Sequence, residues 1–271
     1  MIDLHCHLLP GIDDGPADKT LALAMAEIAF ADGIRTVACT PHIYPGMYEN
    51  DAAGIKAACL AFQAELDERG IGLQLTTGAD VHLDEDLVGG IRAGRIPTLA
   101  GSRYLLLEPP HHVAPPRFDQ SVFQLLVAGI VPVITHPERL TWIEDHYGIF
   151  VQLVKAGAWM QVTAGSVTGR FGKRPRYWAE RMLDEGLVHL LATDAHHPQR
   201  RPPLLAEARD AAAGRLGHAE AVHLVSTRPQ GILDNQAPAA LPPLPESRAS
   251  GTQRPGFWRR LVGQGAGHIS G

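Results

Sequence analysis

Seven short apolar runs recur along the chain at intervals of roughly thirty residues, the length of a strand followed by a crossover helix. The runs cover 2–4, 36–39, 73–76, 104–107, 131–134, 159–162 and 188–192. Helix-like stretches follow them at 17–31, 51–69, 85–92, 120–128, 142–156, 175–185 and 204–216. This order predicts an α/β fold with parallel strands, arranged as an open doubly wound sheet or a closed barrel. In both arrangements ligands bind at the carboxyl ends of the strands.

The composition divides the chain into two parts. Of the 271 residues 45% are hydrophobic, which is enough for a substantial core, and we expect one domain over 1–235. From 236 to 271 the chain is rich in Pro, Ala, Gly, Ser and Arg, which predicts a disordered tail. Within it, 257–262 mixes aromatic and basic residues and could make a peripheral contact with a partner or an anionic membrane surface.

Charge and targeting signals narrow the class of protein. No apolar run is long enough to span a membrane, and the N-terminus does not resemble a signal peptide, so we expect a cytoplasmic protein. The formal net charge of -5 argues against a nucleic-acid partner. The three cysteines form no closely spaced pair and are expected to be reduced thiols.

Residue types that bind metals follow six of the seven apolar runs. They are His5 and His7, His42, Asp80, Glu108, His136, and Asp194 with His196; Asp13 and Asp14 follow in the first loop. Because side chains alternate along a strand, the imidazoles of His5 and His7 are expected on one face. Each residue alone would be an ordinary strand-end side chain or helix cap. Six strand ends together indicate a metal centre, and this many nitrogen and oxygen ligands imply two or three Zn, Mn or Fe ions.

The motifs resemble the polymerase and histidinol phosphatase (PHP) superfamily and, within it, the bacterial capsular-polysaccharide type of metal-dependent protein-tyrosine phosphatase. The segments that carry the resemblance are 2–7, 9–15, 38–42, 101–108, 136–139 and 194–196, and the similarity runs from Met1 to about Gln236. The resemblance implies a distorted seven-stranded (β/α) barrel of the PHP type with a trinuclear centre, in which manganese is the first expectation. The implied ligands are His5, His7, Asp14, His42, Asp80, Glu108, His136, Asp194 and His196.

Two positions depart from the family pattern. At the third strand the family usually has Glu, whereas this chain has Asp80, which is one methylene shorter. Either the loop moves inward or one metal is bound less tightly. After the last ligand the family often has Asn, but here His197 follows, and it could assist phosphate binding or lie at the surface.

The resemblance implies hydrolysis of phosphate monoesters, in which metal ions activate water and neutralise phosphoryl charge. Arg139, three residues after His136, is the candidate to bind phosphate through two parallel guanidinium N–H groups, an arrangement called a phosphate fork below. Either Arg200 or Arg201 could supply a second fork. An aryl phosphate suits such a site because phenolate, with a pKa near 10, leaves with little acid assistance. The implied partner is the tyrosine-phosphorylated tail of a bacterial autokinase that controls surface or capsular polysaccharide, and an oligomer is possible.

A cysteine mechanism is excluded by spacing, because it requires an arginine six positions after the nucleophile. Six positions after Cys6, Cys39 and Cys59 stand Ile12, Pro45 and Glu65.

Other functions for the same fold and metal ligands stay open. A phosphatase of histidinol phosphate or another small molecule would use the same metals, whereas a PHP nuclease is disfavoured by the acidic charge. A binding module that has lost its metals is disfavoured by the intact ligand set.

Overall fold

The strands of the computed structural model, which describes residues 1–84 and 86–247, form two parallel sheets within those ranges. The smaller sheet has the order β1 (Ile2–Cys6), β2 (Thr36–Cys39) and β4 (Gln74–Thr77). The larger has the order β3 (His42–Ile43), β5 (Asp80–His82), β6 (Tyr104–Glu108), β7 (Val131–Thr135), β8 (Trp159–Thr163) and β9 (Leu190–Ala192). The predicted α/β fold with parallel strands is therefore confirmed, and every predicted apolar run contains part of a strand.

The distorted seven-stranded barrel is not confirmed, because the described strands form two sheets that do not close. After the second and third predicted strands, the chain forms two further short strands, β3 and β5, which lie in the larger sheet, whereas β2 and β4 lie in the smaller one. Pro41 lies between β2 and β3 and has no backbone N–H to donate to a ladder. Two backbone hydrogen bonds still connect the residues at the junction of β2 and β3 with the residues at the junction of β4 and β5. They run from Gly78 N to Cys39 O (3.0 Å) and from Asp80 N to Pro41 O (3.1 Å).

The junction between the last and first strands is also open. In the described ranges, the end of β1 meets the segment after β9 through a single parallel bridge, between Cys6 and Ala195. Two backbone hydrogen bonds flank it, from His7 N to Ala195 O (2.9 Å) and from Asp194 N to His5 O (2.8 Å). The sheets thus come together around a common axis without a continuous ladder.

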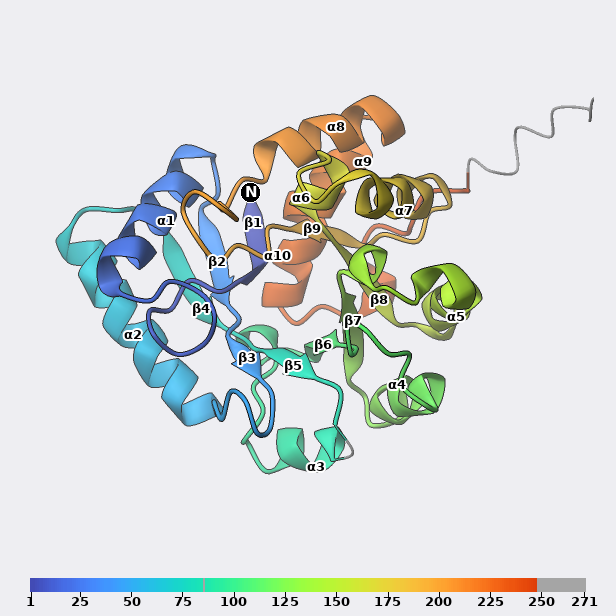
Figure 1. Cartoon of the computed structure of the whole chain (residues 1–271), viewed down its shortest axis with the longest axis horizontal. Helices are drawn as coiled ribbons and strands as arrows, with labels where there is room; N and C mark the ends of the chain where they lie inside the picture. The colour runs from blue at the N-terminus through green and yellow to red at the C-terminus, as the bar shows by residue number, and fades with distance from the viewer. Residues whose placement is uncertain (85, 248–271) are drawn as a thin grey trace, which may run out of the picture.

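Helices lie around the outside of the strands (Figure 1). The predicted ones correspond to α1 (Lys19–Ala31), α2 (Ala52–Glu68), α3 (Leu87–Arg92), α4 (Phe118–Val127), α5 (Ile143–Ala156), α7 (Lys173–Asp184) and α8 (Ala206–Leu216). The short elements are α6 (Ala164–Val167), α9 (His218–Val222), α10 (Arg228–Leu233), the π-helical η3 (His223–Thr227), and the 3-10 turns η1 (Leu99–Gly101), η2 (Pro137–Arg139) and η4 (Pro238–Ala240). None of the described helices is long and apolar enough to cross a membrane.

Two apolar clusters separate the faces of the strands. On β6, Leu105 and Leu107 pack outward in the cluster under the helices, whereas Tyr104 and Leu106 pack in the inner cluster. Alternation along the strand therefore turns Glu108 to the inner face, above the apolar core. On β1 a register shift between Asp3 and Cys6 changes which residues face inward: Leu4 packs in the inner cluster and Cys6 in the outer one. The inner space is thus apolar at its base and polar at the carboxyl ends of the strands.

The chain after 235 packs against the base of the molecule. Leu241 is 7% exposed, and it fits so closely over Gly231 that a β-carbon there would lie 2.1 Å from its Cδ2 atom. The buried Arg228 donates to the carbonyl oxygens of Pro242 (3.0 Å) and Pro243 (2.7 Å). The expectation of a disordered tail from 236 therefore differs from the structure over 236–247, because Arg228 supplies partners that composition does not reveal. Residues 248–271, including 257–262, lie outside the described residues.

Candidate metal centre

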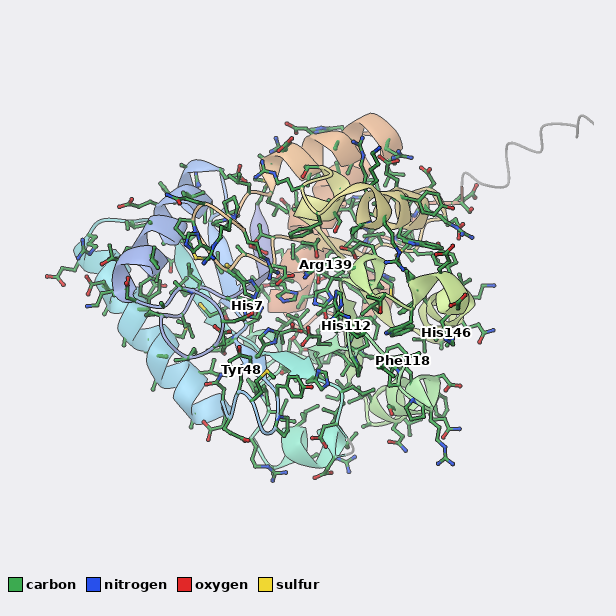
Figure 2. All side chains as sticks on the ribbon, viewed as in Figure 1. His7, Tyr48, His112, Phe118, Arg139 and His146 are labelled. Atoms are coloured by element: carbon green, nitrogen blue, oxygen red, sulfur yellow. The ribbon has the colours of Figure 1, made fainter. Side chains whose placement is uncertain are left out.

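The nine side chains expected to bind metals converge at the carboxyl ends of the strands. They form four overlapping groups, in each of which the possible ligand atoms lie within 4.8 Å of one another. The groups are His7, Asp14, His42 and His196; His5, His7 and Asp80; His5, His136 and Asp194; and His42, Asp80 and Glu108. His7 and Arg139 lie near the centre of the molecule in Figure 2, whereas His146 lies at its edge with α5. Residues far apart in the sequence therefore meet in one polar cluster.

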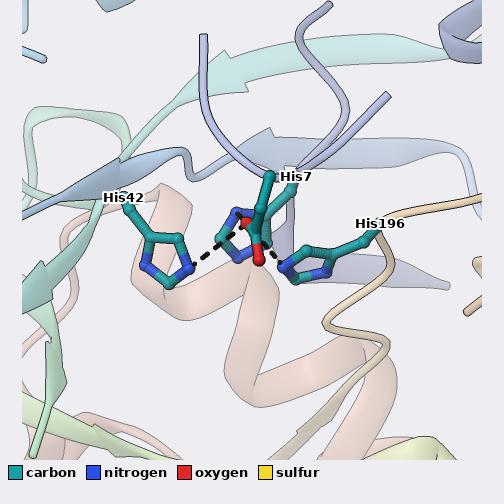
Figure 3. Close-up of side chains that lie close together, drawn as sticks. His7, His42 and His196 are labelled. Carbon is teal, nitrogen blue, oxygen red and sulfur yellow. Dashed lines mark ion pairs between the residues drawn. The ribbon is translucent and has the colours of Figure 1, made fainter. Parts of the chain in front are cut away.

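The group nearest solvent is built around the carboxylate of Asp14. Its Oδ1 atom lies 3.2 Å from His196 Nε2, 3.5 Å from His42 Nε2 and 4.0 Å from His7 Nδ1. Figure 3 shows these three imidazoles turned toward one another. Because the Asp14 side chain is 47% exposed while His7 is buried, this group forms the mouth of the cluster.

The deeper groups are centred on three carboxylates. Asp80 Oδ2 lies 3.3 Å from His5 Nε2 and 3.6 Å from His42 Nδ1, so the shorter acid at the third strand still reaches the cluster. Glu108 lies 3.3 Å from His42 Nδ1 through Oε2 and 3.5 Å from His136 Nε2 through Oε1.

Asp194 completes the inner set. Its Oδ1 lies 3.4 Å from His5 Nε2 and 3.5 Å from His7 Nε2. One carboxylate oxygen therefore faces the imidazoles, which leaves the other free to bind elsewhere.

The imidazole and carboxylate ligands of the cluster fit divalent metal ions. Both carboxylate oxygens of Asp80 are buried and accept no hydrogen bond from the described residues. A buried carboxylate without donors is costly, and a cation between the imidazoles and carboxylates would remove that cost. Imidazole and carboxylate ligands without thiolates suit Zn, Mn or Fe.

The electrostatics of the cluster also call for positive charge. Burial opposes protonation of His5, but the carboxylates of Asp80 and Asp194 prevail and raise its pKa to about 9. For His42 burial acts in the same way, yet its hydrogen bond with Glu108 and the charge of Asp80 raise the pKa to about 10. In the absence of metal, protons on these imidazoles balance the carboxylates, so metal binding would release them.

Two residues outside the nine ligands support them: Gln161, which was not singled out from the sequence, and Asp13, which was named there beside Asp14. Gln161 Oε1 lies 3.0 Å from His5 Nδ1, which favours the tautomer with a free lone pair on Nε2. Asp13 Oδ2 lies 2.7 Å from His7 Nδ1 and also accepts from the backbone N–H of His42. Gln161 belongs to β8, the one predicted strand without a candidate ligand, and its position in that apolar strand was the available signal.

The arginines are placed differently from one another. Arg139 donates from Nη1 to Asp194 Oδ2, and Arg201 donates to the same oxygen from Nη2 at 2.6 Å. Arg200 is exposed and not brought to the cluster; its backbone N–H donates to His197 Nδ1 (3.3 Å). His197 also pairs with Arg201 in an isolated antiparallel bridge, so it shapes the turn that presents Arg201.

The cysteines take no part in the cluster. Cys6, Cys39 and Cys59 are all buried and free. Burial raises the pKa of Cys6 well above its usual range, which disfavours the thiolate that a nucleophile would require.

Known proteins resemble the chain over most of its length. A family model described as "Capsular polysaccharide synthesis, CpsB/CapC" matches residues 1–234. The tyrosine-protein phosphatase YwqE of Bacillus subtilis (strain 168) is 32% identical over 248 residues, which cover 92% of this chain and 97% of the relative. The tyrosine-protein phosphatase CpsB of Streptococcus pneumoniae is 30% identical over 241 residues, with coverage of 87% and 99%.

A solved structure agrees with these sequence relationships. It comes from a study of YwqE from Bacillus subtilis and CpsB from Streptococcus pneumoniae, described as unique metal-dependent tyrosine phosphatases. Its TM-score to this chain is 0.86 at 31% identity, with coverage of 91% of this chain and 98% of the other. The similarity thus includes the whole set of elements that surrounds the polar cluster.

Proposed function

The chain belongs to the capsular polysaccharide synthesis CpsB/CapC family, and from this premise we propose that it is a metal-dependent protein-tyrosine phosphatase. The observation that carries the proposal is the convergence of nine imidazole and carboxylate side chains in four overlapping groups. Two arginines adjoin the same cluster through Asp194. Such a site combines cation ligands with donors for phosphate.

We assign the metal ligands as His5, His7, Asp14, His42, Asp80, Glu108, His136, Asp194 and His196. Four overlapping groups of ligand atoms support a centre of two or three divalent ions, with manganese as the first expectation and zinc or iron as alternatives. When bound, the ions would supply Lewis-acid catalysis, neutralising phosphoryl charge and making water a nucleophile near neutral pH. No side chain is then needed as the nucleophile.

Arg139 and Arg201 are assigned as the residues that bind the phosphoryl oxygens. Each guanidinium carries five N–H groups, and only part of each set is used on Asp194. The remaining N–H groups can bind two phosphoryl oxygens in the planar geometry that arginine favours. Arg201 takes the place of the second fork, since Arg200 is exposed.

The substrate we propose is phosphotyrosine in a protein. The relatives YwqE and CpsB are named tyrosine-protein phosphatases. Tyr48 stacks on His42 with ring centroids 5.5 Å apart, which places an aromatic surface beside the mouth of the cluster. By extension from the family, the partner is the tyrosine-phosphorylated tail of an autokinase in surface or capsular polysaccharide synthesis, and the reaction takes place in the cytoplasm.

The test is hydrolysis of a phosphotyrosine peptide and of histidinol phosphate by protein stripped with a chelator and then given Mn, Zn or Fe separately. We expect the stripped protein to be inactive and one or more metals to restore turnover of the peptide. His7→Ala should abolish this restoration because it removes a ligand shared by two groups. His218→Ala is the matched control, because His218 is exposed and outside the cluster.

Each alternative predicts a different result. Turnover of histidinol phosphate without the peptide would assign a small-molecule phosphatase, and cleavage of single-stranded DNA would assign a nuclease. Metal binding without turnover of any substrate would leave a binding module. Activity that survives metal removal, or that thiol alkylation alone abolishes, would contradict the metal mechanism itself.

A further inference from the structure

One aromatic ring lies against both arginines that adjoin the cluster. The Cζ atom of Arg139 lies 4.9 Å from the centroid of the Phe171 ring, and that of Arg201 lies 5.7 Å from it. Both distances fall within the range of cation–π attraction. Phe171 comes from the connection between α6 and α7, so it lies outside the segments that supply the ligands.

The position of the ring is determined by the backbone around it. Phe171 N donates to Gly165 O at 3.3 Å. Gly165 has no side chain where the ring packs, and a β-carbon there would lie 3.0 Å from Phe171 Cε2. Gly169 and Gly172, on either side of the ring, have φ angles of +84° and +94°, which glycine adopts without strain. This loop therefore holds Phe171 in one place.

The ring lies beside two guanidinium groups of like charge. Arg139 and Arg201 carry like charges, yet both donate to the single oxygen Asp194 Oδ2. The negative face of an aromatic ring attracts a guanidinium and fixes its plane without occupying any of its N–H groups. The N–H groups that Asp194 leaves unused then stay available for phosphate.

We propose that Phe171 is a positioning residue that orients the Arg139 and Arg201 forks toward the phosphoryl group. This inference rests on the proposed phosphatase function. It assigns to the loop between α6 and α7 a part in phosphate binding that acts through the two arginines.

The experiment compares Phe171→Leu, Phe171→Tyr and Phe30→Leu in the metal-loaded full chain. Phe30→Leu is the matched control, because Arg35 lies 4.2 Å over the Phe30 ring in an equivalent contact away from the cluster. We expect Phe171→Leu to lower kcat/KM on a phosphotyrosine peptide about tenfold and to weaken inhibition by inorganic phosphate by a similar factor. Metal content should not change. Phe171→Tyr, which keeps the ring, and Phe30→Leu should both stay close to the parent enzyme.

Several outcomes would overturn the inference. Unchanged kinetics in Phe171→Leu, or a Tyr variant as impaired as the Leu variant, would show that the ring does not orient the forks. Loss of metal together with activity would mean that Phe171 is only structural. If Phe171→Leu fails to fold, Gly165→Ala shifts the ring by a few tenths of an ångström and should weaken phosphate inhibition in the same direction, whereas unchanged inhibition would count against the inference.

The failure of the proposed function can be recognised separately. If the parent enzyme does not hydrolyse the peptide, that function is wrong, whatever the variants do. Calorimetric titration of the metal-loaded protein with inorganic phosphate still measures the forks. Equal phosphate affinity in the parent, Phe171→Leu and Phe171→Tyr proteins would then overturn the positioning inference.

Discussion

Asp80 is a buried carboxylate at the centre of the proposed metal site. It is fully buried, and neither of its carboxylate oxygens accepts a hydrogen bond from the described residues. We predict that Asp80→Asn binds one fewer metal ion per chain, because the amide oxygen is a weaker ligand than a carboxylate. The metal-free variant should also lose stability, because Asp80 raises the pKa of both His5 and His42 and their protonated imidazoles would lose that balancing charge. Elemental analysis after dialysis and urea unfolding with chelator measure the two effects.

Asp84→Asn serves as the control for Asp80→Asn, since Asp84 is exposed at the end of the same strand region. It should change neither metal content nor stability. Full metal occupancy in Asp80→Asn would remove Asp80 from the ligand set. A metal-free variant as stable as the parent would mean that the carboxylate does not balance protonated His5 and His42.

A second residue-scale prediction concerns Gln161. Its Oε1 atom is the acceptor placed to hold His5 in the tautomer that offers Nε2 to a metal. Gln161→Leu should therefore weaken metal affinity by about 10- to 100-fold, the usual effect of removing such a support. Chelator competition measures this change. Gln63→Leu, on the outer helix α2, should leave the affinity unchanged, and an equal loss there would refute the specific effect of Gln161.

Individual site residues were predictable where their position depends on strand endings alone. Glu108 is the last residue of β6 and Asp194 follows β9, so their convergence follows from parallel topology. The choice between Arg200 and Arg201 depends on a turn closed by His197, and sequence spacing does not determine which side chain faces inward. Gln161 was missed because an amide that supports a ligand has no spacing pattern of its own.

At the scale of elements, the order of strands and helices followed from hydrophobic periodicity, but closure of the sheets did not. Pro41 is visible in the sequence, yet its effect on the ladder depends on which neighbour pairs with it. Among the described residues, β1 meets the segment after β9 through one bridge, between Cys6 and Ala195. Such long-range pairing is decided by packing of the whole ring of elements, which local patterns do not contain.

The segment 236–247 provides a test at the element scale. A chain that ends at Asn235 loses the buried Leu241 and the two carbonyl oxygens that bind Arg228. We predict that its free energy of unfolding falls by about 2–4 kcal/mol, from lost apolar burial and lost hydrogen bonds to a charged donor. Urea denaturation measures the loss.

A chain that ends at Ser247 is the control for this truncation, since it keeps Leu241 and the Arg228 contacts. Its stability should match that of the full chain. If both truncated chains are equally stable, the segment contributes nothing, and the domain boundary proposed at 235 is the better one.

For the molecule as a whole, stability should depend on pH through a buried histidine far from the ligands. His189 is 8% exposed, and its Nδ1 accepts the backbone N–H of Met160 at 3.1 Å. Burial, together with the charge of Arg228, lowers the pKa of His189 to about 3. In the unfolded chain an ordinary histidine has a pKa near 6.5, so between these values the unfolded state binds more protons. The contribution to stability is complete above about pH 6.5 and is lost progressively as the pH falls toward 3.

This linkage gives a measurable difference between two variants. From pH 6.5 to pH 5 the parent should lose about 2 kcal/mol more than His189→Gln, since each pH unit contributes about 1.4 kcal/mol for one proton. Gln retains an acceptor for Met160 N–H but does not titrate. His218→Gln, at an exposed position, should follow the parent. Urea unfolding with chelator at both pH values removes metal binding from the comparison. Parallel pH profiles for the parent and His189→Gln would show that His189 is protonated as easily in the folded protein as in the unfolded chain.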